Sequence, residues 1–225
     1  MDDIPYARIR SAARRHAPVP YPHEPPPSVA PAELDRDSLV AMSALFEQRL
    51  SALRAPDDVQ PSVIRVGGAD EAASAVRSLI KDARVSGDTR DDVLWWGDEP
   101  PAPREWRLGV TPALALIAAT GSVIVDLPAP PRGWSSLLVD THVVVAGADQ
   151  LLPDLAAFYE TLASWRDAGR ASGCQVCVTG CSRTADIEKR LVIPAHGPRR
   201  VCVVMCSAAI DWKDVKALAA CRIDA

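Results

Sequence analysis

The sequence predicts an α/β fold built on an open, mostly parallel, doubly wound sheet. Short β-branched runs alternate with segments of helical periodicity, which is typical of chains that place helices on both faces of a parallel sheet. Of the 225 residues, 48% are hydrophobic and 24% are charged, enough apolar material for one sizeable core. Eight of the 20 prolines fall within residues 1–31. We therefore expect an N-terminal arm there, with a short helix over 4–16, followed by an α/β domain over 32–225.

The first elements of the domain follow from the spacing of apolar side chains. These recur every three or four residues over 32–55, which predicts a helix. The β-branched run 62–66 ends at two glycines and predicts the first strand, and residues 69–84 return to helical spacing. Residues 93–96 and 106–110 predict the next two strands, which a proline-rich loop separates.

The uncharged stretch 108–125 is just long enough for a membrane-spanning helix. A proline near its start and a glycine near its end instead predict a shorter helix over 112–119, capped by Thr111. A strand over 122–126 follows this helix. We therefore expect the stretch to form buried core, with no membrane insertion.

The last third of the chain continues the alternation. Two short apolar runs, 137–139 and 143–145, flank His142, for which a structural or simply solvated role is expected. The remaining predicted elements are a helix over 149–169, a strand over 175–178, a helix over 185–191, a strand over 201–205 and a helix over 215–221.

The charge balance argues against binding to nucleic acid. The chain has 29 acidic and 25 basic residues, a formal net charge of −4 and a pI near 5.6. Nucleic acid needs a strongly positive face, which no run of lysine and arginine supplies. The acidic opening Met1–Asp3 also lacks the basic region of a secretory leader, so we expect a cytoplasmic protein.

The segment Thr179–Glu188 is the most informative part of the sequence. It follows an apolar strand and opens a predicted helix, an arrangement whose backbone N–H groups favour anions. Ligands of open α/β sheets bind beyond the carboxyl ends of the strands, which favours a site here over simple capping of the helix. The candidate ligand-binding residues are Ser182, Arg183, Thr184, Asp186 and Glu188, of which the two acids equally suit the helix dipole.

Two further segments supply candidate polar groups. His196 and Gly197 form a predicted turn, where His196 is the candidate acid, base or hydrogen-bond donor and the alternative is a solvated histidine. Thr120, Gly121 and Ser122 are predicted to cap the C-terminus of helix 112–119, with hydroxyls available to a ligand.

All six cysteines lie in the last 52 residues. The spacing of Cys174, Cys177 and Cys181 suggests an iron–sulfur or zinc site. However, positions three apart on a strand face opposite sides, so packing is favoured over metal. Cys181 is the candidate reactive thiol, because it lies near a predicted helix N-terminus. Burial among valine and methionine residues is predicted for Cys177, Cys202 and Cys206.

The run S-R-T-A-D-I-E at 182–188, followed by A-H-G-P at 195–198, resembles the signature of the LUD-domain family, in particular its lactate utilisation protein C branch. Supporting pieces are A-L-F-E-Q-R-L at 44–50 and the G-V-T-P…I-A-A-T-G-S-V-I-V block at 109–125. The resemblance covers roughly residues 4–16 and 35–206. Two positions depart from the family pattern: Cys181 replaces a proline, and Ala119 replaces an acidic residue.

The resemblance implies a fold like that of the sugar-phosphate isomerase and CoA-transferase superfamily. It also implies an accessory or ligand-binding role in the oxidation of L-lactate to pyruvate, with a small anionic ligand and with iron–sulfur subunits as partners. No cofactor or metal held by this chain is expected. Two alternatives stay open: an enzyme or binding protein for a sugar phosphate or CoA ester, and a metal or redox protein that uses the C-terminal cysteines.

Overall fold

The computed structural model describes residues 38–53, 61–84, 93–98, 106–127, 133–181 and 196–221. All of them belong to one compact unit, which spans residues 34–225. The predicted N-terminal arm lies outside the described residues, so its separation from the domain stays a prediction.

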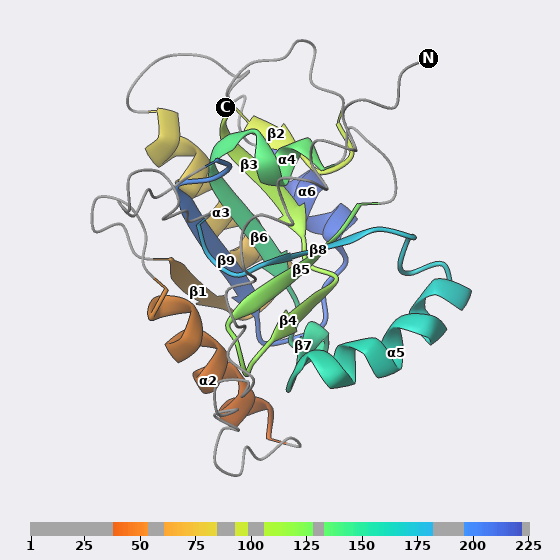
Figure 1. Ribbon diagram of the computed structural model, residues 1–225. Coiled ribbons are helices and arrows are strands. Elements are labelled where there is room, and N and C mark those ends of the chain that lie inside the picture. Colours follow the sequence, from red (N-terminus) through yellow and green to blue (C-terminus); the bar gives the residue numbers. More distant parts are fainter. Residues whose placement is uncertain are drawn as a thin grey trace, which may run out of the picture. The chain divides into compact units, whose positions relative to one another are not determined.

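A five-stranded parallel sheet organises this unit (Figure 1). Its central strands β9, β6 and β3 pair along their whole lengths, and β1 and β2 form its two edges. The predicted α/β class with a mostly parallel sheet is therefore confirmed. In spatial order the strands are β1 (Ser62–Val66), β9 (Arg200–Cys206), β6 (Val139–Ala146), β3 (Trp106–Pro112) and β2 (Val93–Trp95).

One face of the parallel sheet packs against two helices, α3 (Ala69–Arg84) and α6 (Trp212–Cys221). Alternate residues of β6 and β9 enter this core, because successive side chains of a strand point to opposite faces. The fully or almost fully buried members from the sheet are Leu108, Val110, Val143, Val145, Cys202, Val204 and Cys206.

The opposite face packs against the helix α2 (Leu39–Ser51) and a second sheet. The intervening residues of β6 and β9 enter this second core, where Phe46 and Leu50 of α2 are completely buried. The second sheet is mixed, and its outer face packs against α5 (Leu155–Asp167). Its strands, in spatial order, are β7 (Leu151–Leu152), β4 (Ala115–Ile117), β5 (Ser122–Asp126) and β8 (Gln175–Val178).

The helix predicted over 112–119 is wrong. Strand β3 continues to Pro112, and β4 then forms an antiparallel hairpin with β5. Leu116 faces the core between the sheets, whereas Ile117 faces α5. Because both faces of β4 are apolar, its sequence shows no alternation, and a short continuous apolar run does not distinguish strand from helix.

Two other boundaries differ from the prediction. The helix expected over 149–169 begins only at Leu155, after Asp154 accepts the Ala157 N–H at 2.9 Å. The preceding residues form a 3₁₀ turn, Ala148–Gln150, and then β7, which pairs with β4. The two short strands expected over 137–145 are instead the helix α4 (Trp134–Leu137) and the single strand β6.

The other predictions for described segments hold. Helix α3 and the strands β1, β5 and β8 have the predicted bounds, and β2, β3, β9 and α6 differ by one to three residues at their ends. The helix expected over 32–55 is shorter, because α2 begins only at Leu39, after the N-cap Ser38, and ends at Ser51. The stretch 108–125 forms β3, β4 and β5 and is almost entirely buried. Within the described part of the chain, no helix has the length and apolar character needed to cross a membrane. The helices predicted over 4–16 and 185–191 lie outside the described residues.

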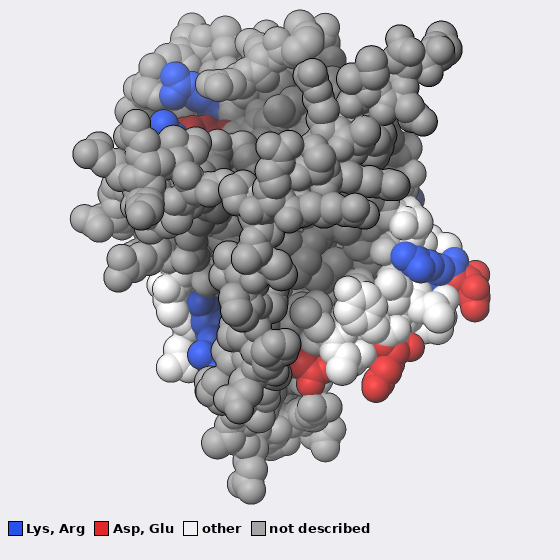
Figure 2. Space-filling view, in the orientation of Figure 1, with Lys and Arg blue, Asp and Glu red and all other residues white. Residues whose placement is uncertain are grey.

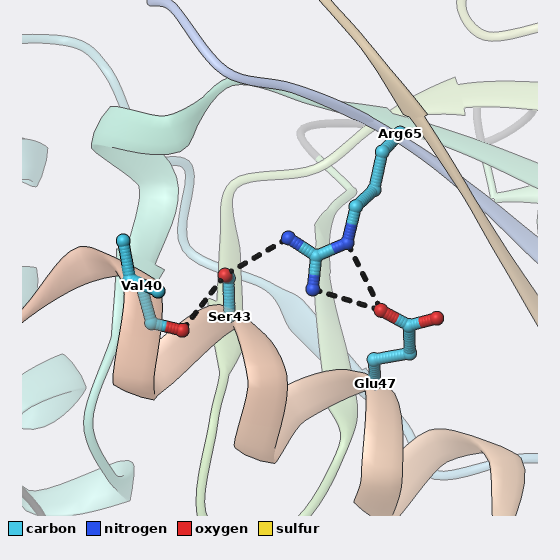
Figure 3. A network of polar contacts seen from close by, with 4 residues as sticks. All are labelled: Val40, Ser43, Glu47 and Arg65. Atoms are coloured by element: carbon cyan, nitrogen blue, oxygen red, sulfur yellow. Dashed lines mark hydrogen bonds and ion pairs between the residues drawn. The ribbon is translucent and has the colours of Figure 1, made fainter.

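Charged side chains lie on the outer surfaces of the helices. Along α5, Glu160, Arg166 and Asp167 are exposed. Figure 2 shows acidic and basic side chains on this side of the molecule. On α2, Glu47 accepts two hydrogen bonds from the Arg65 guanidinium of β1, at 3.0 and 2.8 Å, and Ser43 accepts a third at 3.1 Å (Figure 3). This network joins the edge strand β1 to α2.

Gly109, in the central strand β3, lies against the backbone of α4. A Cβ at this position meets the carbonyl oxygen of Ser135 at 1.8 Å and Val139 Cγ1 at 2.8 Å. We therefore expect Gly109→Ala to lower the free energy of unfolding by about 3 kcal/mol or more, at or above the usual cost of overpacking. Urea denaturation measures this. In the control Gly68→Ala, no atom lies within 4 Å of the new methyl group. An equally large loss of unfolding free energy in the control would contradict the close contact assigned to Gly109.

The pair Arg65 and Glu47 provides a second test of the packing. Their side chains are 49% and 43% exposed, so solvent screens the charges. A double-mutant cycle with Arg65→Ala and Glu47→Ala is expected to give a coupling of about 0.5 kcal/mol, which decreases at 1 M salt. A coupling that does not change with salt argues against an ionic contact.

Candidate functional site

Three hydroxyl groups meet where the hairpin of β4 and β5 lies beside the end of β8. Ser122 Oγ lies 2.7 Å from Thr120 Oγ1 and 2.7 Å from Thr179 Oγ1. The pairing of Val123 with Val178 places Ser122 opposite Thr179 across the antiparallel strands. Ser122 is buried, whereas Thr120 and Thr179 are exposed. The structure thus brings the predicted segment 120–122 together with the start of segment 179–188.

The predicted role of this segment as a helix C-cap is wrong, because no helix precedes it. Gly121 instead occupies the hairpin turn with a φ of +66°, and its N–H donates to the Ile117 carbonyl at 2.9 Å. A Cβ here meets the Leu50 backbone nitrogen of α2 at 2.4 Å. Glycine is therefore required both by the turn and by the close approach of the hairpin to α2.

The described residues on either side of the segment 182–195 contact one another. Cys181 is 4% exposed, and its thiol donates to the Arg199 carbonyl at 2.8 Å. The Arg199 N–H in turn donates to the Asp140 carbonyl at 2.8 Å. His196 is exposed, and Gly197 follows it in a turn with a φ of +72°. The other five predicted residues lie outside the described part of the chain: Ser182, Arg183, Thr184, Asp186 and Glu188.

These contacts locate the described residues on either side of the segment. Arg199 directly precedes β9 and Asp140 lies at the start of β6, so Cys181 and Arg199 lie at the amino edge of the parallel sheet. The sequence predicted a site at the carboxyl edge, because Gln175–Val178 was assigned to the same parallel sheet. That strand is β8, which belongs to the second sheet and runs antiparallel to β5.

Strands β3 and β6 share a buried polar pair that the sequence did not predict. His142 is completely buried in β6, and its Nε2 lies 2.9 Å from Thr111 Oγ1 of β3. Burial lowers the pKa of His142 to about 4, so the imidazole is neutral at pH 7. Its Nδ1 has no hydrogen-bond partner in the described structure. The only signal in the sequence was the position of His142 between apolar residues. It predicted a structural role for His142 but did not identify Thr111 as its partner.

The cysteines divide into two groups. Cys202 and Cys206 are fully buried as predicted, and burial raises the pKa of both thiols. Cys177 is exposed, which contradicts its prediction, because β8 is an edge strand. Cys174 is also exposed, whereas Cys181 is buried. Among the described residues, no group of three or more histidine, cysteine or acidic side chains has the arrangement of a metal site.

The fold and these motifs can be compared with those of known protein families. Residues 104–206, from just before β3 to the end of β9, match the model of the LUD domain. This match and the curated relatives support the resemblance to the LUD-domain family that the signature at 182–198 indicated.

Within this family its curated relatives share one name. A protein named lactate utilization protein C from an Exiguobacterium species is 32% identical over 124 residues, which cover 52% of this chain and 54% of the relative. A protein of the same name from Deinococcus radiodurans is 29% identical over 82% of this chain and 87% of the relative. The matched part thus spans about half of the first relative and most of the second.

A solved structure supports the fold. The crystal structure of a DUF162 family protein from Deinococcus radiodurans matches with a TM-score of 0.51 and 20% sequence identity. The match covers 76% of this chain and 99% of that protein. At this identity the likeness concerns the arrangement of the sheets and helices alone.

The burial of His142 predicts a specific loss of stability in acid. The unfolded chain takes up a proton near pH 6.5, whereas the folded state does so only near pH 4. The folded state is therefore destabilised as the pH falls from 6.5 to 4, by about 3 kcal/mol in total from this residue. Denaturation at pH 7 and pH 5 should show a smaller loss for His142→Gln than for the wild type.

The exposed His196 supplies the control for this experiment. His196→Gln makes the same change of side chain at an exposed position, so a smaller loss that appears only for His142→Gln is specific to the buried position. An NMR titration of the imidazole signals measures the same property directly. A His142 signal that titrates near pH 6.5 contradicts the assignment.

Proposed function

We propose that this chain takes part in lactate utilisation, as an accessory or ligand-binding component of a system that oxidises L-lactate to pyruvate. The observation that carries the proposal is the LUD match over residues 104–206, together with curated relatives that are all named lactate utilization protein C. The signature at 182–188 and the His-Gly-Pro turn at 196–198 lie within the matched part.

The ligand in this proposal is a small organic anion such as lactate itself. The Arg183 guanidinium binds its carboxylate, because two parallel N–H donors match two carboxylate oxygens. Ser182 and Thr184 add hydroxyl donors, Asp186 and Glu188 orient the segment, and His196 is the proton donor or acceptor. Two observations support this proposal: the hydroxyl cluster of Thr120, Ser122 and Thr179, and the contact of Cys181 with Arg199, two described residues on either side of the signature segment.

The partners in this proposal are iron–sulfur subunits. Oxidation of lactate to pyruvate removes two electrons and two protons from the C–H and O–H bonds of the substrate, so the system needs an electron acceptor. We assign that role to iron–sulfur partner proteins, whose clusters accept one electron at a time. This chain then contributes ligand binding and contacts to those partners.

Growth of a strain that lacks this protein tests the proposal. We expect loss of growth on L-lactate as the sole carbon source, with normal growth on glucose. Wild-type protein should restore growth on lactate, whereas Arg183→Ala should not, because an unpaired carboxylate then loses its charged hydrogen bonds.

Arg65→Ala is the matched control, since it removes an exposed arginine on β1. Among the described residues, the Arg65 guanidinium forms hydrogen bonds only with Ser43 and Glu47. Arg65→Ala should restore growth like the wild type. Normal growth of the deletion strain on lactate would overturn the role in lactate utilisation. Rescue by Arg183→Ala would retain that role and remove the proposed site.

A further inference from the structure

A cavity lies at the carboxyl edge of the parallel sheet, opposite the edge where Cys181 contacts Arg199. It has a volume of about 530 Å³, within the usual range for small-molecule sites of roughly 300–1,000 Å³. Trp96 follows β2, Leu114 follows β3, and Trp212 begins α6. The second sheet contributes Asp126 from the end of β5, and Arg170 follows α5. Ligands of open α/β sheets bind at this edge.

Two indole rings form the aromatic part of the wall. Trp96 Nε1 donates to the Asp126 carbonyl at 3.1 Å, which fixes this ring against the second sheet. Trp212 packs on Trp95, with ring centroids 6.1 Å apart and the planes tilted by 49°. Both rings are half-buried and line the cavity. Indole faces held in this way favour a flat, unsaturated ligand group, since stacking on an aromatic face is strong and needs no particular hydrogen-bond pattern.

Charges of both signs line the same cavity. Arg170 lies over the Trp165 ring at 5.2 Å, and neither it nor Lys213 forms an ion pair with any described residue. Asp126 accepts three hydrogen bonds, but all of them at Oδ1: from the N–H and hydroxyl of Ser172, and from the side chain of Gln175. The other carboxylate oxygen, Oδ2, receives no hydrogen bond within the described structure.

The acidic side chains of the cavity limit the class of ligand that it can bind. Asp126 and Asp211 repel a bare anion, so a ligand that uses both cations must also carry hydroxyl or amino donors for the acids. Asp211 already accepts the Lys213 N–H at 2.8 Å, which caps the start of α6. The positive charge for an anionic group therefore comes from the side chains of Arg170 and Lys213. A molecule as small as lactate contacts only part of a wall of this size.

We propose that this cavity binds a mononucleotide. Its base stacks on Trp96 and Trp212, its ribose hydroxyls donate to Asp126 and Asp211, and its phosphate binds Arg170 and Lys213. This site is separate from the one in the signature segment and does not depend on the lactate role.

Isothermal titration calorimetry of the full chain with AMP tests the proposal. We expect saturable binding by the wild type, and binding about tenfold weaker for Lys213→Ala, since that change removes one charge-assisted contact from an exposed position. Lys81→Ala is the control, because Lys81 is exposed on α3 outside the cavity lining. Arg183→Ala should bind AMP like the wild type, which separates this site from the proposed lactate site.

Three smaller probes test the parts of the assignment. Ribose 5-phosphate lacks the base, adenosine lacks the phosphate, and L-lactate lacks both, so each should bind at least about tenfold more weakly than AMP. Trp212→Phe should keep most of the affinity for AMP and Trp212→Leu should lose it. No saturable heat with AMP, equal affinity for ribose 5-phosphate, or unchanged binding by Lys213→Ala would each overturn the proposal.

Discussion

Both faces of the parallel sheet must be buried, and the rest of the structure depends on this constraint. Strands β6 and β9 are buried almost throughout, and their alternate side chains enter two different cores. Helices α3 and α6 cover one core, as in an ordinary doubly wound domain. The chain covers the other with α2 and a complete second sheet, which is itself covered by α5. Because each sheet buries a face of the other, the β4–β5 hairpin and the helices α2 and α5 are all needed to exclude water from the cores on that side.

Covering both faces of the parallel sheet brings backbone segments into close contact at two glycines. Gly109 allows α4 to contact β3, and Gly121 allows the β4–β5 hairpin to contact the end of α2. His142 and Thr111 are a polar exception inside the same region, held by a single 2.9 Å hydrogen bond. A neutral imidazole is tolerated there because burial of the charged form is far more costly.

The two edges of the parallel sheet carry different chemical groups. Cys181, which follows β8, contacts Arg199 at the amino edge, and the hydroxyl groups of Thr120, Ser122 and Thr179 meet at the end of β8. The carboxyl edge instead holds two tryptophans with acidic and basic side chains. An α/β sheet covered only by helices offers its carboxyl edge as the usual ligand site. Here Asp126 at the end of β5 and Arg170, which follows α5, also line the cavity at the carboxyl edge.

The sequence by itself determined the α/β class, the elements α3, β1, β5 and β8, and the resemblance to the LUD family, because periodicity and a short motif are local properties. It also indicated that segments 120–122 and 179–188 carry polar groups. Only the tertiary structure decided that residues 115–117 form a strand, because a segment apolar on both faces has the same pattern in either state. Likewise, only strand pairing decided that β8 lies in a second sheet, that Ser122 meets Thr179, and that His142 meets Thr111. Such contacts join residues 31 or more positions apart, and their partners are set by sheet register, which no local pattern encodes.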